Sequence, residues 1–189
     1  MRSRTTNRQR GFTLGETLTA LAVAGIGLTL AVPGLQAFSR DNGQAVAVNQ
    51  LVGTMHMARS EAVMRNARVA VCASAGGERC DGQSWSDGWI AFLDSDGNLE
   101  RSSAEALVDR VPAPGMVLVS AQFATGFSYA ADGHASNATG DTHAGEFAFC
   151  EAGADNAARV VILRASGLPT LAARGRDGAV VRCPAGPEA

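Results

Sequence analysis

The feature that most constrains this chain is a long apolar stretch near its start, from Gly11 to Phe38. No charged residue occurs between Leu18 and Val32, and an apolar run of about 20 residues is long enough to cross the hydrocarbon core of a bilayer as a helix. One carboxylate, Glu16, lies near the beginning of the run. Because a charge at membrane depth costs roughly 3 kcal/mol, this residue is expected to need a partner. The stretch therefore predicts a membrane helix that carries one functional acid.

Three features of this stretch resemble the N-terminal motif of type IV prepilins and of the pseudopilins of type II secretion. The Gly11–Phe12 bond resembles the cleavage site of prepilin peptidase, and Glu16 is the fifth residue after that bond. Pro33 lies twenty-one residues after Phe12. Gly15 departs from the family, which usually has a large aliphatic residue at this position. The glycine lowers helix propensity by about 1 kcal/mol but removes no chemical group that the motif needs.

The resemblance implies a route of processing and assembly. Residues 1–11 would form a cytoplasmic leader that prepilin peptidase removes, and the new amine of Phe12 would be N-methylated. Glu16 is expected to face the amine of a neighbouring subunit in a filament, so that the two charges offset each other. Pro33 removes a backbone donor and is expected to bend or loosen the helix.

The same resemblance implies partners and a location. The partners are prepilin peptidase, the inner membrane and other pilin or pseudopilin subunits. The chain would cross the inner membrane once and place its globular domain in the periplasm, or outside the cell when it is part of a pilus.

Two other interpretations of the N-terminus stay open. The basic leader and the small residues Ala22, Val23 and Ala24 resemble an ordinary secretory signal peptide, and the apolar run alone would suit a plain membrane anchor. Glu16 and three nearby threonines interrupt the apolar core that a signal peptide needs, and the run continues to Val32. The prepilin interpretation is therefore favoured.

The charge balance limits which ligands the domain could bind. The chain has 189 residues, enough for one anchored helix and one domain of ordinary size. Its 16 basic residues are all Arg, and four of them precede Gly11. The part of the chain after Gly11 therefore has 12 Arg and 18 Asp and Glu, which gives it a net charge of −6. A mildly acidic domain argues against general binding of polyanions, but not against a local basic patch.

An even number of cysteines follows the apolar stretch, which suggests two disulfides formed in an oxidising compartment. The sequence allows three pairings of Cys72, Cys80, Cys150 and Cys183. We favour Cys72–Cys80, which would join a hairpin, and Cys150–Cys183, which would tie a strand to the C-terminal edge. Free buried thiols are the alternative. A zinc site is disfavoured because no C-x2-C pair occurs.

After Pro33 the helical pattern resumes and then changes to a strand pattern. Apolar residues from Val48 to Val63 recur at three- and four-residue steps, which predicts an amphipathic helix half packed on a sheet. The runs typical of strands are 67–74, 89–93, 116–120, 126–130, 146–150, 159–164 and 179–183. One helix from about Phe12 to Arg65 followed by many short strands predicts an α+β fold with antiparallel sheets.

The expected domain organisation follows from these patterns. The four parts are a prepilin leader at 1–11, a transmembrane and assembly half of the helix at 12–35, an amphipathic half at 36–66, and a β-rich globular domain at 67–189. No internal repeat or long low-complexity segment is present.

A narrower resemblance, to the GspH/FimT group of minor pilins and pseudopilins, covers Gly11 to about Pro184. It rests on Arg59-Ser60-Glu61-Ala62 near the helix end, on the spacing of the four cysteines, and on the run from Trp85 to Asp94. It implies the pilin fold, a long N-terminal helix packed on antiparallel sheets. It also implies a minor pilin of a type IV pilus or a minor pseudopilin of type II secretion, two systems that the sequence does not separate.

A second hypothesis is a DNA-binding minor pilin that acts in DNA uptake. Some members of the group carry Gly-Arg-x-Arg after a Ser-Gly pair, whereas Leu168 follows Ser166-Gly167 here. Arginine guanidinium groups suit phosphate, and the candidates are Arg164, Arg174, Arg176 and Arg182. Because this segment has no aromatic residue to stack on bases, solvated arginines on a strand edge are the plainer interpretation.

The remaining candidates are metal ligands and catalytic groups. Four residues match positions one, three, five and twelve of a calcium loop: Asp94, Asp96, Asn98 and Glu105. Leu99 stands at position six, where that loop needs glycine, and a β-turn explains the same residues. His134 and His143 lie in stretches typical of surface loops. Because no nucleophile elbow, H-E-x-x-H or phosphate loop occurs, we expect neither catalysis nor a cofactor or metal.

Overall fold

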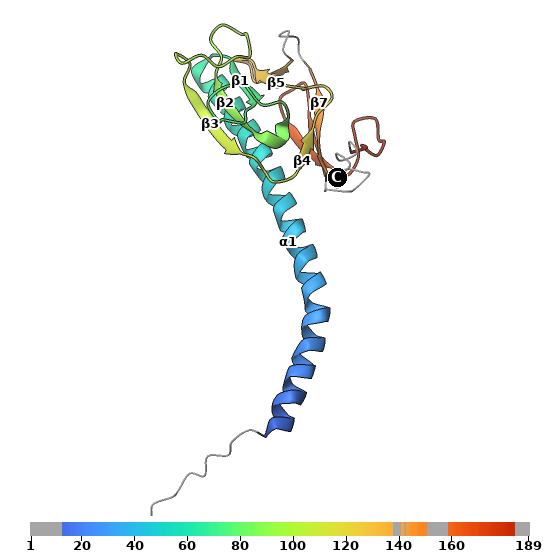
Figure 1. Cartoon of the computed structure of the whole chain (residues 1–189). Coiled ribbons are helices and arrows are strands. Elements are labelled where there is room, and N and C mark those ends of the chain that lie inside the picture. The colour runs from blue at the N-terminus through green and yellow to red at the C-terminus, as the bar shows by residue number, and fades with distance from the viewer. Residues whose placement is uncertain (1–12, 138–140, 142, 151–158, 184–189) are drawn as a thin grey trace, which may run out of the picture. The chain divides into compact units, whose positions relative to one another are not determined.

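The computed structural model describes residues 13–137, 141, 143–150 and 159–183. Over these residues it forms one long helix, a short 3₁₀ turn and nine strands in two antiparallel sheets (Figure 1). The chain divides into two compact units, of which the first ends at Asp41 and the second begins at Asn42.

The helix α1 spans Leu14–Arg65 and continues through Pro33. It ends where Asn66 turns to a left-handed φ of 49°. The N–H of Ala67 then donates to the carbonyl oxygen of Ala62 at 3.1 Å, and both features are typical of a C-terminal helix cap. The predicted helix is therefore confirmed over its described residues.

Sheet A has the strand order β3-β2-β1-β5-β6 with every neighbouring pair antiparallel. Its strands are β1 (Val69–Ala73), β2 (Gly88–Leu93), β3 (Leu107–Pro112), β5 (Gly126–Tyr129) and β6 (Ala135–Ser136). The central strand β1 is buried on both faces, because Val69 and Val71 belong to the main core while Ala70 and Cys72 belong to a smaller apolar cluster. Alternate residues of a strand point to opposite faces, so this second cluster covers the outer face of sheet A.

Sheet B has the strand order β4-β7-β8-β9, again antiparallel throughout. Its strands are β4 (Val117–Val119), β7 (Gly145–Cys150), β8 (Arg159–Leu163) and β9 (Pro169–Ala172). Phe147 and Phe149 of β7 and Val161 of β8 are fully buried in the same main core as sheet A. The two sheets thus share one core.

The second half of α1 supplies the third side of that core. Its buried residues are three and four positions apart: Ala47, Val48, Leu51, Met55, Ala58 and Ala62. The centre is aromatic, with Trp85 of the 3₁₀ turn η1 (Trp85–Asp87) meeting the ring of Phe147 edge to face at 5.0 Å. The Trp85 indole N–H donates to the carbonyl oxygen of Phe123 at 2.6 Å, so its one polar atom is satisfied. This packing confirms the α+β fold class with a helix against antiparallel sheets.

Six of the seven predicted strands occur within two residues of the expected ends, as β1, β2, β4, β5, β7 and β8. The predicted strand at 179–183 is wrong. The backbone at its start forms a turn instead, in which the N–H of Gly175 donates to Ala179 at 2.9 Å and that of Gly178 donates to Gly175 at 3.0 Å. Only Arg182 forms an isolated bridge there.

Three strands, β3, β6 and β9, were not predicted, and each lies at the edge of its sheet. Their sequences lack a clear alternation of apolar and polar residues: β3 contains Asp109, Arg110 and Pro112, and β9 begins with Pro169. Charged residues and proline are tolerated at edges because one side of an edge strand forms no ladder. The pattern that reveals a central strand is therefore weak at an edge.

Candidate functional site

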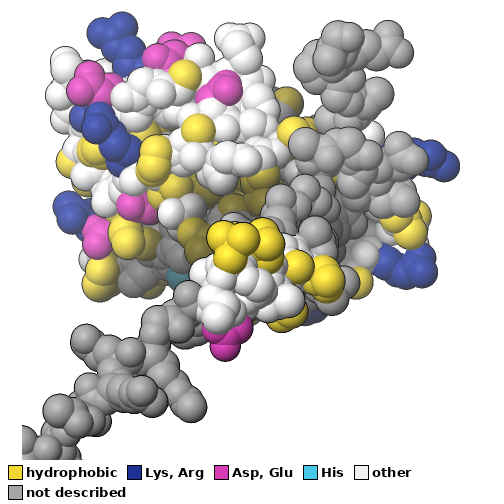
Figure 2. All heavy atoms as spheres, turned by 60° about the horizontal axis from the view of Figure 1, so that its bottom comes forward, with side chains coloured by type: hydrophobic (Ala, Val, Ile, Leu, Met, Phe, Trp, Pro, Cys, Tyr) yellow, Lys and Arg dark blue, Asp and Glu magenta, His cyan; other side chains and the backbone are white. Residues whose placement is uncertain are grey.

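The first half of α1 exposes large apolar side chains. Leu14, Leu18, Leu21, Val23 and Ile26 are between 60% and 81% exposed. Figure 2 shows hydrophobic side chains gathered on the part of the molecule that comes forward in that view. A contiguous apolar surface of this kind marks a site of contact with another protein or with a membrane.

The predicted processing site lies outside the described residues, because Gly11 and Phe12 both precede Thr13. Pro33, the other predicted motif residue, lies within α1. Among the described residues, no helix combines the length and the hydropathy that a membrane span requires.

Glu16 lies in the first turn of α1, with Thr13 as its partner. The N–H and the hydroxyl of Thr13 both donate to Oε2 of Glu16 at 3.0 Å, and the N–H of Glu16 donates to the Thr13 hydroxyl at 3.4 Å. These reciprocal bonds form a capping box. Thr13 was not among the predicted site residues, although the Thr-x-x-Glu spacing is the signal that could have found it.

Two further threonines in this segment satisfy their hydroxyl groups on the helix itself. Thr17 donates to the carbonyl oxygen of Leu14 at 2.8 Å. Thr19 donates to the carbonyl oxygens of Gly15 and Glu16, both at 3.0 Å. Such local bonds to the preceding turn pair the hydroxyl groups of Thr17 and Thr19. The threonines that interrupt the apolar run are thus compatible with an apolar environment.

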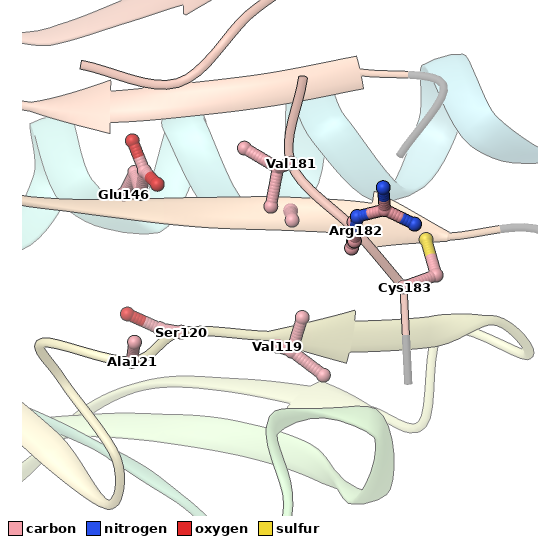
Figure 3. A pocket seen from close by; sticks show the side chains of 8 residues that line it. Val119, Ser120, Ala121, Glu146, Val181, Arg182 and Cys183 are labelled. Carbon is pink, nitrogen blue, oxygen red and sulfur yellow. The ribbon is translucent and has the colours of Figure 1, made fainter. Parts of the chain in front are cut away.

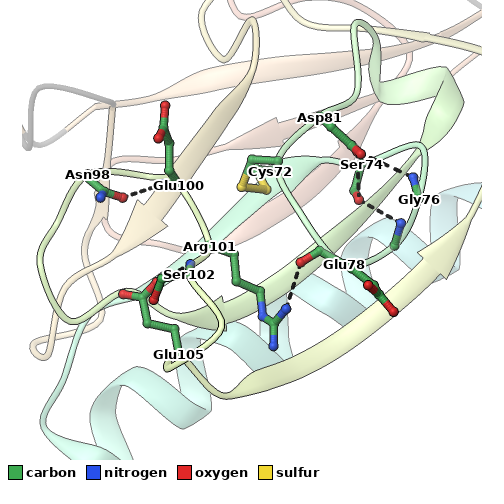
Figure 4. Close-up of a disulfide and its surroundings, with 12 residues drawn as sticks. Cys72, Ser74, Gly76, Glu78, Asp81, Asn98, Glu100, Arg101, Ser102 and Glu105 are labelled. Carbon is green, nitrogen blue, oxygen red and sulfur yellow. Dashed lines mark hydrogen bonds between the residues drawn. A yellow bond between two sulfur atoms is a disulfide. The ribbon is translucent and has the colours of Figure 1, made fainter.

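Both favoured disulfides are present. Cys72 of β1 is bonded to Cys80, with Cα atoms 5.5 Å apart (Figure 4). Cys150 at the end of β7 is bonded to Cys183, with Cα atoms 5.8 Å apart. The second bond ties Cys183 of the C-terminal segment to the end of β7 in sheet B.

Two of the four candidate DNA-binding arginines contact the chain itself. The backbone N–H of Arg176 donates to Oε2 of Glu146 at 2.7 Å, and its Nη1 donates to the carbonyl oxygen of Ala144, also at 2.7 Å. The Nη1 of Arg174 donates to the carbonyl oxygen of Gly178 at 3.3 Å. These guanidinium groups therefore have local roles in the turn that follows β9.

The other candidate arginines lie in the same C-terminal part of the chain. Arg176 donates to the carbonyl oxygen of Ala144 just before β7, and Arg182 precedes Cys183, which is bonded to Cys150 at the end of β7. The two segments meet where the Val181 side chain lies beside Gly175. Arg164 is exposed beyond the end of β8, and DNA binding stays a prediction.

An open groove of about 410 Å³ lies beside the second disulfide (Figure 3). Its walls come from β4 and the turn after it, from β7 and from the C-terminal segment: Val119, Ser120, Ala121, Glu146, Ala148, Val181, Arg182 and Cys183. Figure 3 shows the Val181 side chain between those of Glu146 and Arg182. The acid and the base are thus kept apart, and the arrangement has no evident chemistry.

The loop after β2 brings three of the four calcium-pattern residues together. One carboxylate oxygen from each of Asp94, Asp96 and Glu105 lies within 4.8 Å of the other two. The histidines have other neighbours: His134 lies 3.1 Å from Asp132, and the His143 ring meets Phe123 at 5.8 Å. Within the described part of the chain, the three carboxylates are the group whose spacing would suit a metal ion.

Comparison with known families matches two parts of the chain. Residues 47–167 match the family described as type II transport protein GspH. Residues 6–32 match the prokaryotic N-terminal methylation motif. The first match covers more than half of the chain and contains α1 from Ala47 onward and most of both sheets.

Two crystal structures of the type IV minor pilin FimU from Pseudomonas aeruginosa strain PAO1 have a similar fold. The structure in space group P21 gives a TM-score of 0.57 at 17% identity and covers 75% of this chain and 98% of FimU. The structure in space group P65 gives a TM-score of 0.54 at 18% identity and covers 71% of this chain and 98% of FimU. No curated protein matches the sequence of this chain.

Proposed function

Because this chain belongs to the GspH family and carries the prokaryotic N-terminal methylation motif, we propose that it is processed by prepilin peptidase and enters a filament through α1. It is a minor type IV pilin or pseudopilin. Cleavage would fall between Gly11 and Phe12, followed by N-methylation of Phe12. The observation that carries this proposal is the match of the methylation motif to residues 6–32, which include the cleavage bond, Glu16 and the exposed apolar start of α1.

The first half of α1 would lie in the inner membrane before assembly and against neighbouring helices afterwards. Its exposed leucines favour both environments, and the Thr17 and Thr19 hydroxyls already have partners on the helix. A membrane interior accepts a helix because all backbone groups are paired inside it. The globular unit would lie in the periplasm, an oxidising compartment that suits its two disulfides.

Glu16 would act at the moment of assembly. In the single chain its carboxylate is held by Thr13 in the first helical turn, one residue beyond the new terminus at Phe12. A charged group at membrane depth costs roughly 3 kcal/mol, and the methylated amine of a neighbouring Phe12 would carry the opposite charge. Pairing the two would favour a subunit that docks in the correct register over one that does not. The role is structural, and we assign no catalysis to this chain.

Intact mass spectrometry of the protein from hosts with and without prepilin peptidase tests the processing step. With the peptidase, the expected mass is that of a chain beginning at a methylated Phe12; without it, the leader should remain. Gly11→Val should block cleavage, whereas Gly15→Ala, a matched change downstream of the bond, should not. A first residue at Gly25 would instead identify ordinary signal peptidase and contradict the proposal.

A further inference from the structure

The loop between β2 and β3 gathers three carboxylates in one place. One oxygen each from Asp94, Asp96 and Glu105 lies within 4.8 Å of the other two. Calcium binds oxygen ligands at about 2.3–2.6 Å, so two ligands of one ion are at most about 5 Å apart. Carboxylates this close repel one another unless a cation lies between them. The spacing would therefore allow all three carboxylates to bind one calcium ion.

Asp94 gives a second, independent sign that a ligand belongs here. Its side chain is only 1% exposed. Oδ1 accepts the N–H groups of Gly97 at 2.9 Å and Asn98 at 3.2 Å. Oδ2 is also buried but accepts no hydrogen bond. A buried acceptor without a donor destabilises the folded state, because it has lost its hydrogen bonds to water and no protein group replaces them. A cation bound to Oδ2 would compensate for that loss.

The other two carboxylates are held in place and still have free lone pairs. Glu105 accepts the N–H of Ser95 on Oε1 at 2.8 Å and that of Ser102 on Oε2 at 2.9 Å. Asp96 accepts the N–H and the side-chain amide of Asn98, at 3.2 and 2.9 Å. Because an ionised carboxylate has about four acceptor positions, these bonds orient the groups without exhausting them.

The backbone also makes the turn that a calcium loop requires. Leu99, at position six of the pattern, has a φ of 59°, in the left-handed region that glycine normally occupies. Its side chain is buried in the cluster on the outer face of sheet A, with Ala70, Ile90 and Phe92. Burial of the leucine therefore holds a conformation that its side chain disfavours. The absence of glycine at this position does not exclude the loop.

Two arginines face the cluster without cancelling its charge. Arg68 lies next to Gly97 and its charge acts on Asp94, while the charge of Arg101 acts on Glu105. Figure 4 shows Arg101 turned toward the backbone of Glu78, to which its Nη1 donates at 2.7 Å. Three carboxylates against two guanidinium groups leave a net charge of −1.

We propose that the loop from Asp94 to Glu105 binds one calcium ion through the carboxylates of Asp94, Asp96 and Glu105, with water and loop carbonyl groups completing the shell. The ion would tie the end of β2 to the start of β3 over the outer face of sheet A. This proposal concerns the globular unit and is independent of leader cleavage and of filament assembly.

Calorimetric titration of the full mature chain in detergent, stripped with EDTA, tests the site with calcium chloride as the probe. One ion should bind per chain, and the unfolding midpoint should rise with calcium concentration because the ion binds the folded state. Asp96→Asn is the main variant, since this side chain is exposed, and it should weaken calcium binding at least tenfold. Asp132→Asn removes an exposed carboxylate from another loop and should bind like the unchanged chain.

Asp94→Asn supplies a readout that a merely destabilised loop would not give. It should abolish the calcium-dependent rise of the midpoint without lowering the midpoint of the EDTA-treated chain, because it neutralises a buried oxygen that has no donor. Absence of binding by the folded chain up to about 10 mM calcium would overturn the proposal, as would unchanged affinity in Asp96→Asn. Equal affinity for magnesium would overturn the assignment to calcium.

Discussion

Trp89 of β2 donates its indole N–H to the hydroxyl oxygen of Thr54 on α1 at 3.1 Å, and both residues are buried. Thr54 in turn donates its hydroxyl to Oδ2 of Asp109 on β3 at 2.6 Å. This chain of two hydrogen bonds links the helix to two strands of sheet A. Apolar contacts alone are tolerant of sliding, whereas these directional bonds specify how α1 lies along the sheet.

Thr54→Val is expected to destabilise the globular unit by about 1–3 kcal/mol, because the shape is kept while the Trp89 N–H and the Asp109 carboxylate both lose a partner. Thr54→Ser keeps the hydroxyl and is the matched control, and it should lower the stability of the globular unit less than Thr54→Val does. Thermal unfolding followed by tryptophan fluorescence measures both. Equal midpoints for the valine and serine variants would show that the hydrogen bonds contribute nothing.

Gly167→Ala is expected to be strongly destabilising, by more than about 2 kcal/mol. Gly167 has a φ of 81°, and a methyl group there would overlap the carbonyl oxygen of Gly133 and lie 3.0 Å from Nε of Arg59. That nitrogen donates to the same Gly133 oxygen at 3.0 Å. The substitution should therefore disturb the contact of Arg59 on α1 with the turns at Gly133 and Gly167. Denaturant unfolding measures the loss of stability.

Gly178→Ala is the control for that experiment, because Gly178 has nearly the same φ of 80° but no atom within 4 Å of an added methyl group. It should lower stability by only about 1 kcal/mol, which is the cost of placing a residue with a Cβ atom in the left-handed region. If the two alanine variants lose the same stability, the contact with Gly133 is unimportant.

Glu16→Ala is expected to leave the chain in the membrane but prevent its entry into filaments, because the amine of the neighbouring subunit would lack a counter-charge. Glu16→Gln keeps an acceptor for Thr13 without the charge and should fail in the same way. Thr13→Val removes only the local partner and should assemble. Immunoblots of membrane and sheared-filament fractions distinguish these outcomes, and normal assembly of the glutamine variant would rule out a pairing role.

Asp81 should make a small, pH-dependent contribution to the disulfide loop. Its carboxylate accepts the N–H of Gly76 (Figure 4) and that of Ala75. The Gly76 N–H is the main cause that lowers the pKa of Asp81 below 3.8. A lowered pKa in the folded state means stability that is present above pH 3.8 and is lost as the pH falls through the folded-state value.

Asp81→Ala should therefore lower the unfolding midpoint at neutral pH, and its difference from the unchanged chain should shrink below pH 3.8. Midpoints measured across this range check the sign. A difference that grew on acidification would show that the carboxylate does not act through its charge.

Some of the fold could be predicted because its signal is local. The three- and four-residue steps of α1, the two phenylalanines of β7 and the β-branched run of β8 reflect burial on one element at a time, and those elements were predicted to within two residues. The edge strands β3 and β9 carry charges and proline where a ladder is absent on one side, so the same signal was missing. The segment 179–183 shows the converse error, since an apolar run held by a disulfide needs no ladder.

By itself, the sequence determined the N-terminal methylation motif, the apolar first half of α1 and the α+β class, because each depends on residue type and spacing along the chain, and it narrowed the cysteine pairing to three possibilities. Only the tertiary structure decided that Trp89 reaches Thr54, thirty-five residues away, and that Oδ2 of Asp94 is buried without a hydrogen-bond donor. Those contacts depend on how separate elements pack and on which polar atoms the packing removes from water. No local pattern carries that information.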